Sequence, residues 1–449
     1  MRLAARLFGG GLLWWLGTVG ATTESPQPLP EPLTLETALE AASSDHPALA
    51  LAQAELAQTL ALRERAAAED DLTLDLSLQA RRIEPNELAL DQSSDDSRAV
   101  LTLNKTLYDF GRTANATAAG DEQTAANTQR LELARQRQRR EIMARFFAVL
   151  EADLEAAVAN EVMAVDYVTL DKLRDEHELG KRSDLDLLTA ESAYEESRMR
   201  RLRAENALRV TRARLAAALD RPEQLPRNLR TPRLTGNPNA LPDYPELLKQ
   251  AREGNPELLA LRQTLAAGQA ARQAAKAKRH PKLYLELEAA EYRRDLASRD
   301  PFVALLGLDV PLYQGGRIDA QIAATEAQIA AARATLRAEE YALQQAVLET
   351  WQSVLALRSQ LTQAEVLGDY RDLYLDRSRA QYELEVKTDL GDSMVEQTRA
   401  RLFAARTAFE LALAREKLVE LTGNSAYSAL APATTANGDP PAANREPTP

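Results

Sequence analysis

Two very long runs without proline constrain this chain more than any other feature. One extends from Thr113 to Asp220 and the other from Leu312 to Leu430. Because proline kinks or ends helices, such runs predict continuous helices. We expect the first to run from about Thr113 to Leu179, turn near Gly180 and return to Leu219. At about 1.5 Å per residue, the outgoing helix would measure about 100 Å, which far exceeds a globular domain.

The two runs begin with related motifs, Leu-Tyr-Asp-Phe-Gly-Arg at 107–112 and Leu-Tyr-Gln-Gly-Gly-Arg at 312–317. The equivalent residues of the two motifs are 205 positions apart. The same offset relates Phe146 to Trp351 and Ser183 to Thr388 further along the helices. This agreement predicts an internally duplicated chain. The candidate junction residues are Tyr108, Gly111, Arg112, Tyr313, Gly316 and Arg317.

The first long run carries apolar residues at helical spacing between Ile142 and Val165, whereas its other faces carry Arg, Glu and Gln. This pattern predicts a coiled-coil-like surface hairpin rather than a buried core.

Four short stretches change from helical spacing to strict alternation of apolar and polar residues, which is typical of strands. They lie at Leu72–Ala80, Leu101–Leu107, Leu283–Ala289 and Phe302–Leu312, and they predict two hairpins. The pattern fits a soluble antiparallel sheet with one wet face, or a membrane β-barrel. A closed barrel needs about eight strands or more, so several chains would have to pool theirs.

The chain ends and the linkers have their own composition. Residues 1–21 combine Arg2 and Arg6 with an apolar run and small residues, which predicts a secretory signal peptide, with an N-terminal membrane helix as the alternative. Export of a chain without a membrane-spanning helix favours the membrane β-barrel over the soluble sheet.

A Pro-rich linker at 22–33 precedes a helix from Thr34 to about Asp70, interrupted at His46–Pro47. The expected organisation is a first repeat at 34–220, a linker at 221–245, a second repeat at 246–423 and a disordered tail at 424–449.

Composition excludes several classes of function. The chain has no cysteine, so it has no disulfide, thiolate metal site or lipidated cysteine. A net charge of −12 argues against nucleic-acid binding. The three histidines lack metal-ligand spacing, and no catalytic or cofactor motif is present. His177 beside Glu178 is interpreted as a solvated pair. We therefore predict a protein that is not an enzyme, with no cofactor and no metal site.

The two helix turns, at 179–186 and 384–392, concentrate charged residues. Ser183 and Thr388, each followed by an acid, are suited to cap the returning helices. Asp186 and Asp392 are less needed for capping, and several copies in a ring could form an acidic constriction. The tip candidates are Arg182, Asp184, Asp186, Lys387, Asp389 and Asp392.

In order along the chain, these motifs resemble the TolC-like outer-membrane efflux and secretion channel family, the outer membrane factors. The resemblance extends from Leu33 to Gly423. It includes Leu-Thr-Leu-Glu-Thr-Ala-Leu at 33–39, His46-Pro47, both junctions and the first tip. It implies a mainly α fold with a small β part. In such a fold, three chains pool four strands each into a twelve-stranded transmembrane β-barrel and stack long helical hairpins into an α-barrel.

The resemblance also implies a function. A homotrimer in outer-membrane lipid, with a long periplasmic extension, would be the passive exit duct of a tripartite efflux pump or type I secretion system. Its tips would dock to a periplasmic adaptor and an inner-membrane transporter, and would stay closed until recruited. A soluble periplasmic coiled-coil scaffold or adaptor is the alternative.

The second tip departs from the family pattern. Asp186 matches the usual acid of the returning helix, but Gly391 stands at the equivalent place and Glu385 replaces the usual glycine. Asp389 and Asp392 are the possible substitutes. At the junctions, Tyr108 and Tyr313 are expected to be aromatic anchors at the membrane boundary, and Gly111 and Gly316 to allow the turn from strand to helix. Five polar strand residues are expected to face the lumen: Thr73, Asp75, Glu286, Glu288 and Asp309.

Overall fold

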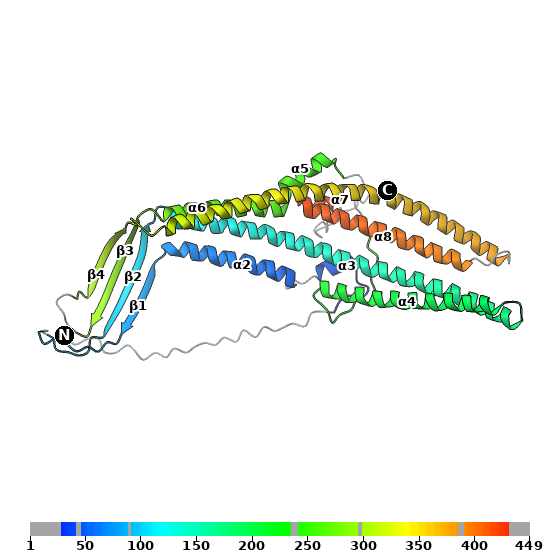
Figure 1. Cartoon of the computed structure of the whole chain (residues 1–449), viewed down its shortest axis with the longest axis horizontal. Helices are drawn as coiled ribbons and strands as arrows, with labels where there is room; N and C mark the ends of the chain where they lie inside the picture. Colours follow the sequence, from blue (N-terminus) through cyan, green and yellow to red (C-terminus); the bar gives the residue numbers. More distant parts are fainter. Residues whose placement is uncertain are drawn as a thin grey trace, which may run out of the picture.

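The computed structural model describes residues 28–41, 46–88, 91–234, 241–294, 299–384 and 390–430. The molecule is a long rod with a small sheet at one end and two helical hairpins at the other (Figure 1). Glu385, Lys387, Thr388 and Asp389 lie outside the described residues, as do the predicted signal peptide and the chain beyond Leu430.

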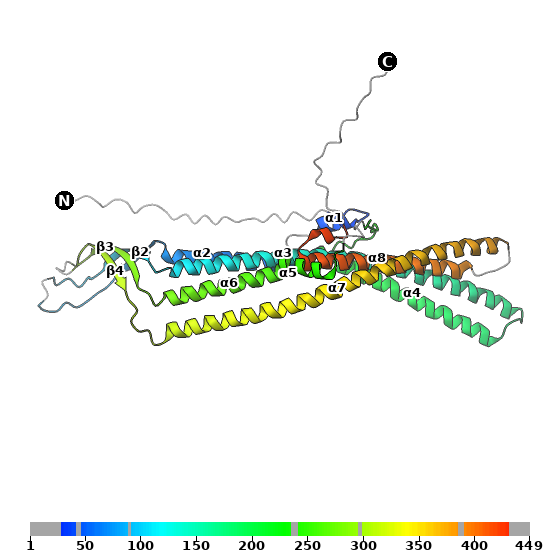
Figure 2. The same ribbon diagram turned by 90° about the horizontal axis from the view of Figure 1, so that it is seen from above.

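Two helices form most of the rod, α3 (Arg112–Glu178) and α7 (Arg317–Glu383), and each contains 67 residues. The returning helices are α4 (Asp184–Ala218) and α8 (Leu390–Thr422). Figure 2 shows both hairpins reaching the same end of the molecule. The expected helical hairpins are therefore confirmed, and the first agrees with its predicted limits to within one or two residues. Among the described residues, no helix has both the length and the apolar character needed to cross a bilayer.

Shorter helices complete the rod: α1 (Leu35–Glu40), α2 (Pro47–Ala67), α5 (Tyr244–Gly254) and α6 (Pro256–Ala277). Thr34 caps α1 through a capping box with Thr37, and Pro47 occupies the first turn of α2, where its missing N–H is not needed. The predicted break at His46–Pro47 is thus confirmed. Two 3-10 turns, Ala68–Asp70 and Ser425–Tyr427, follow α2 and α8.

The four strands are β1 (Thr73–Gln79), β2 (Arg98–Tyr108), β3 (Lys282–Tyr292) and β4 (Phe302–Asp309). They form one antiparallel sheet in the order β1-β2-β3-β4, so the two predicted hairpins pair through β2 and β3. The prediction that the last strand reaches Leu312 is wrong. Pro311 has no N–H for the ladder, and Leu312 is 92% exposed.

The middle of α3 is buried, so the prediction of a surface hairpin without a core is wrong there. Ile142, Phe146 and Phe147 pack against Leu33 and Leu35 at the N-terminal segment and against α4 and α8. Phe147 stacks on Phe409 with ring centroids 4.5 Å apart and planes 3° apart. The sequence pattern could not show that α1, α4 and α8 converge on this part of one long helix.

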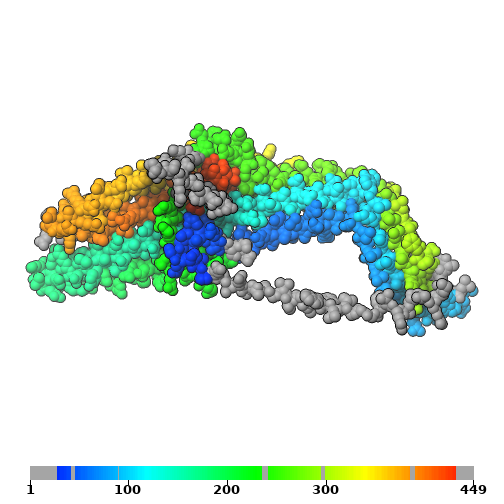
Figure 3. Space-filling model, turned by 180° about the vertical axis from the view of Figure 1, so that it is seen from behind, coloured from blue at the N-terminus to red at the C-terminus, as the bar shows by residue number. Residues whose placement is uncertain are grey.

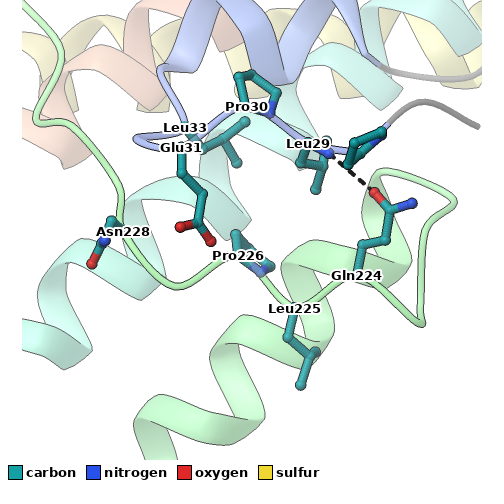
Figure 4. A pocket seen from close by; sticks show the side chains of 9 residues that line it. Leu29, Pro30, Glu31, Leu33, Gln224, Leu225, Pro226 and Asn228 are labelled. Carbon is teal, nitrogen blue, oxygen red and sulfur yellow. Dashed lines mark hydrogen bonds between the residues drawn. The ribbon is translucent and has the colours of Figure 1, made fainter.

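The N-terminal segment is bound to the linker between the two halves. Leu33 donates its N–H to the carbonyl of Asn228 at 2.9 Å and accepts from Arg230 N–H at 2.9 Å. Figure 4 shows a second contact, in which Leu29 N–H donates to Gln224 Oε1 at 3.2 Å. Leu29 and Leu33 therefore attach this segment to the linker, and Leu33 is 1% exposed, whereas Pro28, Pro30, Glu31 and Pro32 remain exposed.

The predicted start of a disordered tail at residue 424 is also wrong. Tyr427 is 6% exposed and Ala429 is 3% exposed, one in each of the two hydrophobic cores. Ala429 N–H donates to Glu416 Oε1 at 3.2 Å. Figure 3 shows α1 and α5 thickening the rod near its middle, where these terminal contacts lie.

Candidate functional site

The sheet has one apolar and one polar face. Directly opposed residues share a face, so Leu76 on β1 continues through Leu101 and Ala289 to Phe302. On this face Leu76 is 64% exposed and Phe302 is 63% exposed. The other face is polar on β1 and in the middle of β3, and it carries the five residues expected to share it: Thr73, Asp75, Glu286, Glu288 and Asp309. On β4 this face also carries Val303 and Leu305. A single sheet layer therefore presents a broad, uncovered apolar surface.

The outer edges of this sheet belong to β1 and β4, which each pair on one side within the described chain. All seven residues of β1 are exposed. An open edge leaves N–H and C=O groups available to another chain, and the apolar face of a sheet has to be buried against another element. Both features call for partners that cover the edges and the apolar face.

At the strand-to-helix junctions the backbone takes the left-handed conformation twice in succession. Gly111 has φ 80° and Gly316 has φ 76°, as expected for residues that reverse the chain direction. The preceding residues, Phe110 and Gly315, have φ 55° and 59°. Phe110 takes this disfavoured conformation while stacking on His280, with centroids 5.6 Å apart. The two junctions thus share a backbone geometry despite their different residues.

Side chains fix the first junction more firmly than the second. Asp109 accepts hydrogen bonds from Gly111 N–H at 3.0 Å and from Thr113 N–H at 2.6 Å, which satisfies N–H groups at the start of α3. Arg112 donates to Glu69 at 2.9 Å, whereas Arg317 donates to Gln314 at 2.8 Å. Sequence reasoning missed Asp109, although an acid just before a helix is a capping signal.

The junction tyrosines are exposed, Tyr108 at 56% and Tyr313 at 88%. Tyr108 ends β2, and Tyr313 lies four residues beyond Asp309, the last residue of β4. Both occupy the boundary between sheet and helices, where an aromatic anchor would lie.

At the first helix tip, hydrogen bonds cap both the end of α3 and the start of α4. Gly180, with φ 71°, ends α3, and the next N–H, from Lys181, bonds the carbonyl of Glu176 at 2.8 Å. Ser183 Oγ accepts from Asp186 N–H at 3.2 Å, while the Asp186 carboxylate accepts from Ser183 N–H at 3.2 Å. The hydrogen bonds from Ser183 lower the pKa of Asp186. Asp186 is therefore a capping residue, which the sequence reading had judged less needed.

Two further pairs cross this tip. His177 Nε2 lies 2.6 Å from Asp184 Oδ1, and Arg182 Nε donates to Glu176 at 2.7 Å. This hydrogen bond from Arg182 lowers the pKa of Glu176. His177 is partly exposed and Glu178 is exposed, and the partner of His177 is Asp184, which lies across the turn. Arg182, Asp184 and Asp186 therefore lie together, and each takes part in holding the turn closed.

Of the second tip, the structure describes Leu384 at the end of α7 and the residues from Leu390 onward. Asp392 is exposed in the first turn of α8, and Ser378 and Ser393 bond each other across the hairpin at 2.8 Å. Gly391 lies against α3: a Cβ added there would be 2.8 Å from Val165 Cγ2. A side chain at position 391 would therefore meet Val165, whereas Asp186, 205 positions earlier, has room for its carboxylate. Lys387 and Asp389 lie outside the described residues.

The comparisons with known proteins agree with this geometry. A model of the outer membrane efflux protein family matches residues 247–424. The CmeC outer membrane channel of Campylobacter jejuni is 12% identical, with TM-score 0.70 over 87% of this chain and 85% of CmeC. The outer membrane protein VceC of Vibrio cholerae is 19% identical, with TM-score 0.67 over 87% of this chain and 96% of VceC. The MtrE outer membrane channel of Neisseria gonorrhoeae is 16% identical, with TM-score 0.67 over 88% and 91%. A comparison with curated protein sequences found no match.

The fold is therefore that of the outer-membrane channels, mostly helical with one four-stranded sheet. The resemblance to the TolC-like outer-membrane efflux and secretion channel family agrees with these findings: residues 247–424 match the outer membrane efflux protein model, and the fold matches channels of this kind. Relatives of this kind are transport proteins rather than enzymes.

We expect Gly391→Ala to loosen the second tip. Alanine favours a helix over glycine by about 1 kcal/mol, but overpacking against Val165 costs about 1–3 kcal/mol. Hydrogen exchange of the first turn of α8 should therefore accelerate, and Val165→Ala should restore it in the double variant. Gly368→Ala is the control, because nothing lies within 4 Å of its added Cβ. Equal exchange in Gly391→Ala and the unmodified protein would refute the close approach.

We expect Ser183→Ala to remove about 1 kcal/mol from the start of α4, as for other N-caps. Because the pKa of Asp186 is lowered in the folded state, its contribution is complete above the unfolded value of about 3.9 and is lost as pH falls through the folded pKa. Amide exchange at residues 184–187 should report both effects. Ser192→Ala on the exposed face of α4 is the control. Protection that does not change below the unfolded pKa would contradict the capping box.

Proposed function

We propose that three copies of this chain form an outer-membrane channel that is the passive exit duct of a tripartite efflux pump or type I secretion system. The observation that carries the proposal is the two-faced sheet. It exposes Leu76 and Phe302 on one side, gathers Asp75 and Glu288 on the other, and leaves both edges open. Twelve strands from three such sheets would close the edges, place the apolar face in lipid and the polar face around a lumen.

The helical part supports the same proposal. α3 and α7 carry the rod far beyond the sheet, and both hairpins end together away from it (Figure 1). A duct through the periplasm needs such length, and its tips would meet a periplasmic adaptor and an inner-membrane transporter. Energy would come from the inner-membrane partner, since the duct itself only conducts.

The alternative, a soluble periplasmic coiled-coil scaffold or adaptor, requires another protein to cover the apolar face. Nothing in the described chain covers Leu74, Leu76 or Leu78, which are 59%, 64% and 72% exposed. We therefore favour the channel.

We expect Leu76→Lys to prevent assembly, whereas Ser77→Lys on the opposite face is tolerated. A lysine at mid-bilayer costs about 2–4 kcal/mol in each chain, but a lumen lysine stays in water. The measurement is the amount of trimer in the outer-membrane fraction, seen as a band whose gel migration changes on heating. If both variants behave alike, or if the unmodified protein is a monomer soluble without detergent, the membrane channel is refuted.

The tip carboxylates are proposed to constrict the closed channel. Asp392 is exposed at the second tip, while Asp186 is bound in the cap of the first. We expect Asp186→Ala combined with Asp392→Ala to raise single-channel conductance in planar bilayers. Asp392→Ala alone separates loss of charge from loss of the cap. Unchanged conductance in both variants would refute the acidic gate but would leave the proposal of a channel intact.

A further inference from the structure

A cavity between α7 and α8 combines two arginines with apolar walls. This open cavity has a volume of about 470 Å³ and lies near the middle of the rod, where Figure 2 shows α7 and α8 passing each other. Arg358 and Leu361 line it from α7, and Leu411 and Arg415 line it from α8. Leu234 of the linker and Ala429 also contribute to the lining. Its size is in the range of small-molecule sites, about 300–1,000 Å³.

Arg415 is held rigidly at this cavity. Its residue is 8% exposed, and its Nε donates to the carbonyl of Tyr427 at 3.0 Å. Burial, together with the charge of Arg358, lowers the pKa of Arg415, while Glu416 opposes the shift. Arg358 and Arg415 line the same cavity, and both stay charged because arginine does not deprotonate in proteins.

The carboxylates nearby are engaged elsewhere or lie at the rim. Glu416 accepts hydrogen bonds from Ser428 Oγ and Ala429 N–H and lies 3.6 Å from Arg139. Glu365 lines the cavity, but it is exposed. Among the described residues, no carboxylate oxygen lies within 4.0 Å of a guanidinium nitrogen of Arg358 or Arg415. The positive charge at the cavity is therefore not balanced within hydrogen-bonding range.

We propose that this cavity binds a small amphipathic anion, whose carboxylate or phosphate group lies between Arg358 and Arg415 and whose apolar part contacts Leu361 and Leu411. Guanidinium groups bind such anions through paired, charge-assisted hydrogen bonds. Leucine and alanine side chains would be further removed from water by an apolar ligand, which favours an amphipathic anion over a bare one. The bound molecule would link α7 to α8 just where they leave the core. The site is independent of the channel proposed above.

The probe for this site is 4-phenylbutyrate, with 4-phenylbutanol as its neutral analogue and inorganic phosphate as the bare anion. Titration calorimetry on the purified full chain in nanodiscs should show saturable binding of one phenylbutyrate per chain. Phenylbutanol and phosphate should each bind about tenfold more weakly or worse, because each lacks one of the two contacts.

Two variants and one control locate the binding. Arg358→Met keeps the length of the side chain but removes its charge, and it should weaken phenylbutyrate binding about tenfold. Leu361→Trp fills the cavity without changing the charge, and it should abolish binding. Arg333→Met, on an exposed part of the same helix, should leave binding unchanged.

Several results would overturn the proposal. They are the absence of saturable phenylbutyrate binding up to millimolar concentrations, equal binding of phenylbutanol, phosphate binding as tight as phenylbutyrate, and binding that neither Arg358→Met nor Leu361→Trp affects. Binding that appears only after removal of residues 431–449 would also overturn it, because the occupant would then be the chain's own C-terminal segment.

Discussion

The structure depends on one constraint, the continuous packing of α3 along its whole length. Near the sheet, α3 lies against α2 and α6, and Arg130 donates to Thr264 of α6 at 3.3 Å. Near the tips it lies against α4 and α8, and Thr398 of α8 donates to Glu161 at 3.0 Å. Between these regions, Phe146 and Phe147 are buried in the larger core. One continuous helix thereby joins the sheet to the first tip, as the proposed duct requires.

Beside this core, ion pairs connect α3 of the first half to α8 of the second half. Glu420 of α8 is 5% exposed and receives Arg140 at 2.8 Å and Lys417 at 2.8 Å. Burial alone would raise the pKa of Glu420, but Lys417 and Arg140 outweigh it, so the pKa is lowered. Removing one partner of a buried ion pair is far more damaging than replacing the whole pair with apolar residues. The Arg140–Glu420 pair therefore links α8 to α3, whereas Lys417 lies on α8 itself.

Positions that lie 205 residues apart in the chain make different side-chain contacts. Asp186 closes a capping box, whereas Gly391 allows α8 to approach Val165 of α3. Phe110 and Gly315 share a left-handed backbone, but only Phe110 stacks on His280. The two strand-to-helix junctions therefore have the same backbone geometry although their side chains differ. At the other end of the rod, the two tips differ in their charged residues.

The sequence by itself determined the elements of this protein. The absence of proline predicted the long helices, and the alternation of apolar and polar residues predicted the strands. Glycine predicted the turns at 111, 180 and 316. Each of these signals acts within a few residues of the chain. Only the tertiary structure decided which surfaces meet. It buried the middle of α3, brought Asp184 to His177 and ordered residues 424–430 against Glu416. Such contacts depend on how distant segments converge, and no local pattern records that convergence.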